Sequence, residues 1–467
     1  MISFLISIVA LILGYMIYGR FIERIFGPDN RKTPALAHPD GVDYIAMPTW
    51  KVFMIQFLNI AGTGPIFGAI MGAMFGPSSF LWIVFGCIFA GAVHDYLSGM
   101  MSIRHDGAGL PELVGKYMGN TTRIIMLVFS VLMLLMVGAV FVSAPAAILS
   151  QLGGNKYLWI SLIFVYYIIA TLMPIDKIIG KIYPIFAIAL IFMAIGLLVV
   201  LFFKMPNIPE IWDIGNMHAW TSNLSKNGTS LIGDYTAEHS IFPIMFITIA
   251  CGAISGFHAT QSPLMARCIK SEKLGRPVFY GSMITEGLVA LVWAAVASWF
   301  FYSGGWTEVV PHDHVSKFLA DKEYGEAANI VSYVCKGWLG VAGSVLAMLG
   351  VVAAPITSGD TALRSARLII ADFFKFDQKP ILKRLMIAVP MFASVIILLI
   401  WQLTNKDGFN VLWQYFGWSN QTLSVFTLWT ITIFLHKYKK CYWVTLIPAI
   451  FMTVVSLSFI LQPFFDL

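Results

Sequence analysis

The sequence predicts an all-α integral membrane protein with about twelve transmembrane helices. Of its 467 residues, 58% are hydrophobic and only 12% are charged, and the mean hydropathy is +0.79. An average soluble domain carries about 25% charged residues, so this chain has too few polar residues to cover a water-facing surface. Apolar windows of about 20 residues, which are long enough to cross the hydrocarbon core, recur along the whole chain. We therefore expect a lipid bilayer around it.

The apolar windows define the predicted spans in order. The first begins at the N-terminus and lacks the basic region and the cleavage site of a signal peptide, so we interpret it as a retained helix. The fifth is short. The spans are expected near residues 1–19, 51–75, 79–103, 122–149, 157–173, 181–203, 241–263, 277–302, 338–358, 384–402, 411–435 and 441–463.

The basic residues fix the predicted orientation of these spans. The connections after the odd-numbered spans hold 23 of the 30 Lys and Arg residues, and the other connections hold 7. The positive-inside rule places the basic set in the cytoplasm and both termini outside it. Because the basic residues sort by membrane side, the net charge of +6 indicates no nucleic-acid partner. Within the outward connection 303–337, a partial helical period from Val315 to Cys335 predicts a helix on the membrane surface.

Two spans are interrupted by small, helix-breaking residues. The second contains Ala61–Pro65, with the sequence Ala-Gly-Thr-Gly-Pro, and the seventh contains Cys251–Gly256, followed by His258. An unpaired backbone group costs several kcal/mol in hydrocarbon, so a break persists only where it faces protein, water or a ligand. Breaks at corresponding places in two halves point to a transporter's binding site. The sequence therefore predicts a secondary transporter.

The distance between the interrupted spans predicts a repeat. They lie five spans apart, so the unit is five helices, and an odd number forces the second copy to be inverted. The predicted parts are a peripheral helix with a cytoplasmic loop (1–50), the first repeat (51–203), an external loop (204–240), the inverted second repeat (241–435) and a peripheral C-terminal helix (436–467). The alternative is a six-plus-six arrangement with parallel halves and a long basic central loop. The central loop here carries few basic residues, which favours the inverted repeat.

The interruptions supply the candidate substrate-binding residues. Thr63 and Ser255 can cap the half-helices that follow them, and Pro65 suits a first helical turn. Such helix starts offer free N–H groups and partial positive charge, which favours an anionic group such as a carboxylate. Alternatively, glycines four residues apart, at 64, 68 and 72, simply allow close helix packing. The candidates are Ala61, Gly62, Thr63, Gly64, Pro65, Gly252, Ser255, Gly256, His258 and Gln261.

Placing an ionisable side chain inside a membrane span costs free energy, so such residues are functional candidates by default. His258 lies within one turn of the second break, and histidine ionises near neutral pH, which suits proton coupling. Its alternative role is to hold the broken backbone. Asp95 and Glu286 are further coupling candidates, unless each pairs with a base near the interface. Asp360, just past the ninth predicted span, is another coupling candidate, and an ion pair with Arg364 at i,i+4 is its expected structural role.

Several other classes of protein are disfavoured. The five cysteines form no close pair, which indicates neither a disulfide framework nor a metal site. The His-Asp dipeptides at 94, 105 and 312 fall on different sides of the membrane, and no nucleophile elbow, phosphate loop or zinc-binding helix occurs. We therefore expect no enzyme activity and no cofactor. A membrane sensor or channel is the alternative class, although the sequence shows no soluble output domain and no continuous polar stripe.

Several longer motifs resemble those of the carbon starvation protein A (CstA) family. They are Phe26-Gly-Pro-Asp-Asn-Arg-Lys-Thr-Pro-Ala35, Asp40-Gly-Val-Asp-Tyr44, Ile60-Ala-Gly-Thr-Gly-Pro-Ile66, Phe89-Ala-Gly-Ala-Val-His-Asp95 and Ala250-Cys-Gly-Ala-Ile-Ser-Gly-Phe-His258. The resemblance implies an inner-membrane transporter of the amino acid–polyamine–cation superfamily with a LeuT-like fold. It also implies uptake of peptides or of pyruvate during nutrient limitation, with proton coupling.

The resemblance further implies a cation site where the second and ninth spans meet. In a LeuT-like fold a sodium ion, or a residue that replaces it, lies at the positions of the Ala61 carbonyl, Thr357 and Ser358. Hard oxygen ligands of this kind suit Na⁺, so sodium is the alternative coupling ion. This chain has Thr-Ser-Gly-Asp at 357–360 where many relatives have a Thr-Thr-Leu-Asp-like run, so the choice among peptide, pyruvate and another substrate stays open.

Overall fold

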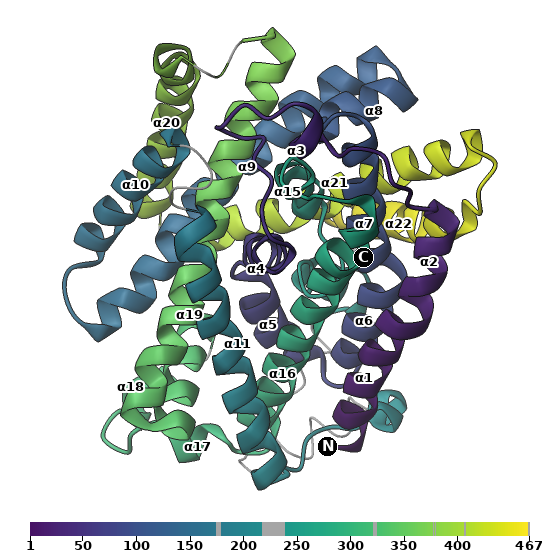
Figure 1. The fold of residues 1–467 in the computed structure, drawn as a ribbon. Helices are drawn as coiled ribbons and strands as arrows, with labels where there is room; N and C mark the ends of the chain where they lie inside the picture. The colour runs from purple at the N-terminus through teal and green to yellow at the C-terminus, as the bar shows by residue number, and fades with distance from the viewer. Residues whose placement is uncertain are drawn as a thin grey trace.

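The computed structural model describes residues 1–173, 179–216, 239–320, 325–376, 378, 380–405 and 408–465. All regular elements of these residues are helical (Figure 1). Eight of the described helices are long and apolar enough to cross a membrane, and a ninth span results if the bent pair Thr49–Ile60 and Gly64–Phe75 is counted as one. The multi-span membrane protein is therefore confirmed, whereas the number twelve stays a prediction.

The first half of the chain supplies four of these spans and the bent pair. Its helices are α1 (Ile2–Leu13), α2 (Gly19–Phe26), α3 (Pro34–Ala37), α4 (Thr49–Ile60), α5 (Ala69–Gly72), α6 (Ser78–Gly86), α7 (Ala92–Arg104), α8 (Leu110–Met118), α9 (Asn120–Leu152), α10 (Lys156–Leu172) and α11 (Ile179–Lys204). The fifth predicted span corresponds to α10, whose 17 residues make it short, as expected. Most of the predicted external loop, 204–240, lies outside the described residues.

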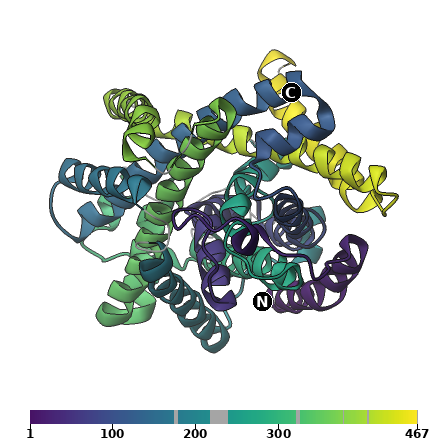
Figure 2. The same ribbon diagram turned by 45° about the horizontal axis from the view of Figure 1, so that its top comes forward.

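The second half contains the other interrupted helix and the longest helix. Its elements are α14 (Phe246–Thr248), α15 (Gly256–Ala266), α16 (Gly281–Tyr302), α17 (Trp306–Val309), α18 (Val315–Ala320), α19 (Ala327–Phe374), α20 (Ile381–Thr404), α21 (Gly408–Lys437) and α22 (Trp443–Phe465). Figure 2 shows α19, in green, running beside the bundle of N-terminal and teal helices.

The boundaries predicted for the ninth span were wrong. α19 covers 48 residues and is interrupted at Gly340, where φ is +64°. The predicted surface helix Val315–Cys335 is instead the short α18 followed by the beginning of α19. The 20-residue apolar window missed this length because α19 continues past the apolar stretch with polar residues that are buried by protein. Asp360 consequently lies within α19 and not beyond it.

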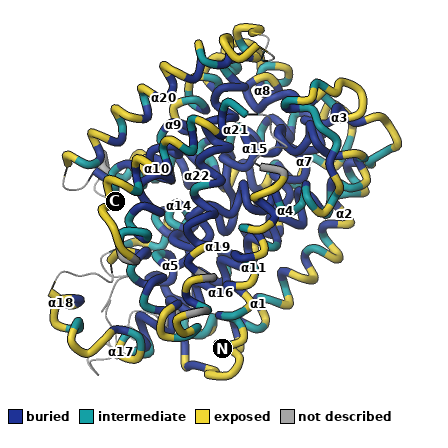
Figure 3. Tube along the Cα trace, turned by 60° about the vertical axis from the view of Figure 1, so that its left-hand side comes forward, coloured by how far each residue is buried: buried dark blue, intermediate teal, exposed yellow. Residues whose placement is uncertain are grey.

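Burial separates a central group of helices from a rim. In the most apolar window of the span Glu272–Tyr302, which contains α16, 89% of residues are buried, against 33% for the first span, Ile2–Phe26, and 39% for α20. Figure 3 shows the same division, with buried residues concentrated along the middle of the molecule. The rim helices expose large apolar side chains, such as Ile17, Ile185 and Leu382, which is the surface that lipid tails would cover.

Both predicted helix interruptions are present. α4 ends at Ile60, and helix resumes at Gly64 with a bend of 55°. In the seventh segment, α14 ends at Thr248 and α15 begins at Gly256. Both breaks are fully enclosed by protein, which satisfies the condition under which irregular backbone persists at membrane depth.

Candidate functional site

His258 joins two of the predicted coupling residues from other helices. Its Nδ1 atom lies 2.9 Å from Oδ2 of Asp95 on α7, and its Nε2 atom lies 3.5 Å from Oε2 of Glu286 on α16. All three side chains are completely buried. The structure therefore brings together three ionisable residues that are far apart in the sequence, one turn from the break before α15.

A second histidine completes this cluster. His94 Nδ1 lies 2.8 Å from the other carboxylate oxygen of Asp95, so Asp95 sits between two imidazole rings. The predicted set of coupling residues did not include His94. Adjacent helical residues point in different directions, so the His-Asp dipeptide alone gave no reason to expect the contact.

The cluster contains groups that can each bind a proton. A neutral imidazole has one N–H donor and one acceptor nitrogen. If His258 donates from Nδ1 to Asp95, its Nε2 is the acceptor and faces the Glu286 carboxyl group. Nε2 and Oε2 of Glu286 are 3.5 Å apart, and neither atom has a hydrogen-bond partner among the described residues. The expectation that Asp95 and Glu286 each pair with a base at the interface is not what the structure shows.

Asn420 of α21 caps the start of α15. Its Oδ1 atom accepts a hydrogen bond from the Phe257 backbone N–H at 2.7 Å and from the Ser255 hydroxyl at 2.9 Å. Ser255 occupies the predicted cap position but its side chain caps nothing, because its hydroxyl donates to Asn420. Gly256 is required there, since a Cβ atom would lie 2.3 Å from the Ser424 backbone nitrogen. Asn420 was missed because nothing in the sequence links it to this helix.

Thr63 also differs from its predicted role. It stands at the position before the helical segment Gly64–Phe75, but its side chain makes no capping bond. Its carbonyl oxygen instead accepts from the backbone N–H groups of Ile66 and Phe67. The Thr63 hydroxyl is buried and has no partner among the described residues. A capping bond needs an extended backbone at this position, whereas Thr63 has helical angles.

The two breaks are in direct contact with each other. A Cβ atom added to Gly64 would lie 2.3 Å from Cβ of Cys251, and one added to Gly252 would lie 3.9 Å from Cα of Pro65. Gly62 faces another way, toward Phe141 and Ser358. The predicted substrate-binding residues thus lie close together, with Ala61 at the end of α4 and Gln261 one turn beyond His258 on α15.

The residues of the predicted cation site lie partly together. The Ser358 hydroxyl donates to the carbonyl oxygen of Leu58 at 3.0 Å, so α19 meets the end of α4 as expected. The Thr357 hydroxyl instead donates to the carbonyl oxygens of Ala353 and Ala354 in its own helix, both at 2.9 Å. Only one of the two hydroxyl groups therefore reaches the interrupted helix.

Asp360 and Arg364 do not form the predicted ion pair. One oxygen of Asp360 accepts from the Tyr183 hydroxyl at 2.7 Å. Arg364 instead pairs with Asp43 at 3.3 Å and donates to the carbonyl oxygens of Ala170 and Met173. The prediction failed because the connection before α4 offers Arg364 a carboxylate and the end of α10 offers it two carbonyl oxygens. Asp360, in the same helix as Arg364, could offer only one carboxylate.

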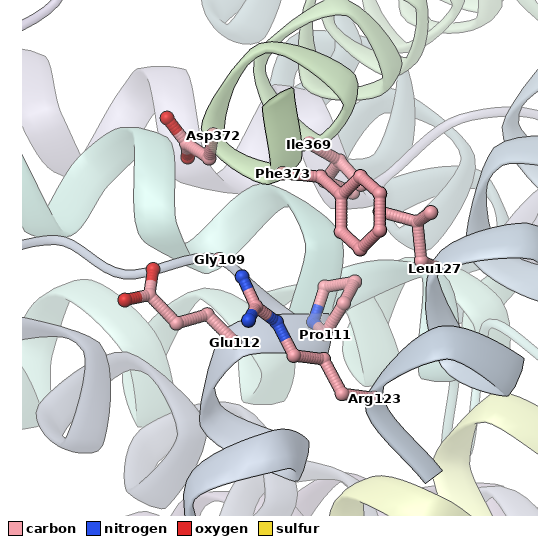
Figure 4. A pocket seen from close by; sticks show the side chains of 8 residues that line it. All are labelled: Gly109, Pro111, Glu112, Arg123, Leu127, Ile369, Asp372 and Phe373. Atoms are coloured by element: carbon pink, nitrogen blue, oxygen red, sulfur yellow. The ribbon is translucent and has the colours of Figure 1, made fainter. Parts of the chain in front are cut away.

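Two neighbouring pockets lie beside the C-terminal end of α19, and the second also borders the end of α15 that is remote from its break. Figure 4 shows the first, in which Arg123 lies between Glu112 and Phe373, and Asp372 projects from the end of α19. The second shares Gly109, Ile369 and Asp372 with the first. It continues along α15 and α19 to residues that lie closer to the cluster, namely Leu264, Pro263, Ser365 and Thr260. On the predicted topology these pockets face the cytoplasm.

Comparisons with known proteins agree with a membrane transporter. The family model described as "Carbon starvation protein CstA" matches residues 1–153, 142–332 and 324–459. An uncharacterized membrane protein of Haemophilus influenzae is 44% identical over 64% of this chain and 91% of its own length. Peptide transporter CstA of Campylobacter jejuni is 26% identical over 95% of this chain and 77% of its own. The Escherichia coli protein of the same name is 24% identical over 97% and 79%.

Solved structures of transporters share the fold. A manganese transporter of Eremococcus coleocola superposes with a TM-score of 0.55 at 12% identity, covering 90% of this chain and 89% of that one. A Na⁺-coupled sialic acid symporter gives a TM-score of 0.51 at 12% identity, covering 100% and 98%. The two CstA relatives and these solved proteins are named as transporters and not as enzymes. Because its family model spans nearly the whole sequence, this chain belongs to the carbon starvation protein CstA family.

Proposed function

We propose that this protein is a secondary active transporter, a cation-coupled symporter that imports small carboxylate-bearing nutrients during carbon starvation. Peptides and pyruvate are the two substrate classes. The observation that carries the proposal is the position of His258 between Asp95 and Glu286, completely buried beside the break before α15. Buried groups of this kind inside a membrane protein mark substrate pathways and proton relays.

The proposed coupling uses the charge of the substrate. A carboxylate that arrives at the start of α15 places a negative charge near His258 and so favours the protonated imidazole. A proton on His258 favours the carboxylate by the same amount, because binding linkage is reciprocal. Asp95 keeps the ring oriented through Nδ1, while Glu286 takes or supplies the proton at Nε2. Substrate and proton would therefore enter and leave together.

The proposed architecture is the LeuT-like inverted five-plus-five repeat of the amino acid–polyamine–cation superfamily. It has twelve spans in the inner membrane, a peripheral helix at each end and both termini outside the cytoplasm. The two interruptions, five spans apart in the predicted order, support it, as does the sorting of 23 of 30 basic residues to one side. The protein would then alternate between outward-open and inward-open conformations about the contact between the two breaks.

Sodium coupling is the second candidate, because Ser358 lies against the Leu58 carbonyl where the predicted site would be. Uptake into proteoliposomes under an imposed pH gradient or an imposed Na⁺ gradient separates the two. We expect the pH gradient to drive uptake and His258→Gln to abolish that uptake while exchange of substrate is retained. The Glu308→Gln variant is the control, since Glu308 is an exposed acid that pairs with Lys204.

Uptake that follows the Na⁺ gradient alone, or an unchanged response in His258→Gln, would refute proton coupling by this cluster. Flux that no imposed cation gradient can concentrate would favour a channel. Substrate binding without any flux would favour a sensor.

A further inference from the structure

Asp360 is a buried carboxyl group of α19 that forms no ion pair among the described residues. Its side chain is completely buried, in a helix that is long and apolar enough to span the membrane. Arg364, one turn further along the helix, pairs with Asp43 instead. An ionised carboxylate without a counter-charge is costly in the interior, and such a group commonly becomes neutral by binding a proton. The surroundings of Asp360 should therefore show where that proton goes.

The hydrogen bonds of Asp360 fit the protonated acid. The Tyr183 hydroxyl of α11 lies 2.7 Å from Oδ2 of Asp360 and 3.0 Å from the carbonyl oxygen of Thr357. A tyrosine hydroxyl has one hydrogen to donate, so it cannot donate to both oxygens, but it can also accept. A proton on Oδ2 lets Asp360 donate to Tyr183 while Tyr183 donates to Thr357. In the ionised state Tyr183 donates to Asp360, and its contact with Thr357 has no hydrogen in it.

The charged and titratable side chains that face Asp360 come from three helices. They are Tyr166 and Tyr167 of α10, Tyr183 of α11 and Arg364 of α19. The Tyr167 hydroxyl donates to a backbone carbonyl of α9 at 2.8 Å. The Tyr166 hydroxyl and Oδ1 of Asp360 are buried and have no hydrogen-bond partner in the described part of the chain. Three phenols and one arginine that is paired elsewhere thus surround Asp360, and a proton is the simplest species that neutralises it.

The oxygen atoms near Asp360 are less suited to a metal ion. A bound metal ion gathers several oxygen ligands around one centre. The Thr357 hydroxyl donates to carbonyl oxygens of its own helix, and the Ser358 hydroxyl donates to the carbonyl oxygen of Leu58. Both hydroxyl groups are committed to other acceptors, which favours a proton at Asp360 over a cation.

The Asp360 site and the His258 cluster lie on different helices that all pack against α4. α4 contacts α11 and α19, which hold Tyr183 and Asp360. It also contacts α15 and α16, which hold His258 and Glu286. The interrupted helix is therefore a shared neighbour of two separate groups of buried acids, and a movement of α4 would change the surroundings of both.

We propose that Asp360 and Tyr183 form a second proton-binding site, separate from the His258 cluster, and that its proton is carried during transport. The role in transport rests on the proposed function, whereas proton binding does not. An O–H bond forms at Oδ2 of Asp360 when the proton arrives, and Tyr183 turns its hydrogen from Asp360 to the Thr357 carbonyl oxygen. The reverse step breaks the O–H bond and releases the proton.

Infrared difference spectroscopy of the purified protein between about pH 8 and about pH 5 tests proton binding, because exposed aspartates stay largely ionised in this range. We expect the unaltered protein to gain the C=O stretching band of a protonated carboxyl group on acidification. Asp360→Asn should lose the Asp360 component of this band. Tyr183→Phe should shift that component in frequency, because the hydrogen-bond partner of the acid is gone. The component should persist in Glu286→Gln, which removes another buried acid.

Asp372→Asn and Tyr167→Phe are the matched controls. Asp372 lies on the same helix but is exposed and pairs with Arg267 at 3.2 Å. Tyr167 is a buried tyrosine near Asp360 whose hydroxyl donates elsewhere. Neither variant should alter the Asp360 component.

An acid-induced spectrum of Asp360→Asn identical to that of the unaltered protein would overturn the proposal. If that variant does not fold, an unshifted band in Tyr183→Phe overturns it equally. A band that Na⁺ removes at constant pH would assign the site to a metal cation and would also contradict it.

Proton counting in proteoliposomes tests whether the proton is carried, with labelled pyruvate and labelled Ala-Ala as probes. At zero membrane potential and a pH gradient of one unit, each proton moved per substrate raises the final accumulation about tenfold. We therefore expect Asp360→Asn to accumulate about tenfold less than the unaltered protein, and Asp372→Asn to accumulate the same amount. Equal accumulation in Asp360→Asn would refute the role in transport. If no pH gradient drives uptake of either probe, coupling at His258 falls, and the infrared bands still decide whether Asp360 binds a proton.

Discussion

Gly64 and Cys251 pack directly against each other, so the two interrupted helices touch at their breaks. A Cβ atom on Gly64 would lie 2.3 Å from the Cys251 Cβ, one on Gly68 would lie 2.7 Å from the Thr248 carbonyl oxygen, and one on Gly72 would meet the Ile249 side chain. The three glycines spaced four residues apart thus have the packing role that their spacing allowed. Gly62 packs instead against α9 and α19, and Gly256 packs against α21.

The Gly64–Cys251 contact predicts a rescue experiment. Gly64→Ala should destabilise the protein by about 1–3 kcal/mol, the typical cost of overpacking a core. Adding Cys251→Gly removes the atoms that collide and should recover part of that loss in thermal unfolding. Gly325→Ala is the control, because a Cβ there meets nothing within 4 Å. Additive losses in the double variant would contradict the direct contact.

The Asn420 cap predicts local loosening of α15. Asn420→Ala removes the acceptor for the Phe257 N–H and the Ser255 hydroxyl, and loss of a helix cap costs about 0.5–2 kcal/mol. Hydrogen exchange of the first turn of α15 should accelerate more than that of α16. Asn405→Ala, at the exposed end of α20, serves for comparison. Equal protection of α15 in both variants would show that Asn420 does not hold the helix start.

Asp43 predicts an acid-dependent loss of stability. Burial raises the pKa of this carboxyl group, but the guanidinium groups of Arg367, Arg364 and Arg267 outweigh burial and lower the pKa below its ordinary value of 3.8. A depressed carboxyl pKa stabilises the fold above the unfolded pKa, and that stability is lost as pH falls through the folded value. The loss should therefore develop below about pH 4.

Asp43→Asn tests this assignment. It leaves Arg364 and Arg367 buried without their counter-charge, so it should destabilise the protein at pH 7 by several kcal/mol. Its melting temperature should then vary less with pH in the acid range than that of the unaltered protein. Asp40→Asn, in the same connection, keeps the Asp43 pair and should retain the steeper acid dependence. Parallel pH profiles of the Asp43→Asn variant and the unaltered protein would assign the acid loss elsewhere.

The distribution of basic residues predicts that both termini lie outside the cytoplasm. An alkaline phosphatase fusion at the C-terminus should be active, and a fluorescent protein that matures only in the cytoplasm should stay dark there. Fusions in the connection between α7 and α8 should give the opposite pattern, because that connection belongs to the basic side. A cytoplasmic C-terminus would refute both the span order and the inverted repeat.

The sequence by itself determined the class of the protein and the places where its helices break. A single segment crosses hydrocarbon on its own only as a helix, whose backbone groups pair internally. Apolar length therefore marks the spans, and glycine or proline within a span marks an interruption. Those signals are local, and the breaks at Ala61–Thr63 and before Gly256 were found from them. Apolar length was less reliable for α19, where buried arginines extend the helix beyond its apolar window.

Only the tertiary structure decided which side chains meet. His258, Asp95 and Glu286 each stood out because an ionisable residue in a membrane span is costly, but their mutual contacts depend on how α7, α15 and α16 pack. The same packing assigned the cap of α15 to Asn420 and the counter-charge of Arg364 to Asp43, both against the local expectation. A hydrogen bond is set by the distance between two groups in space, and spacing along the chain fixes that distance only within one helix.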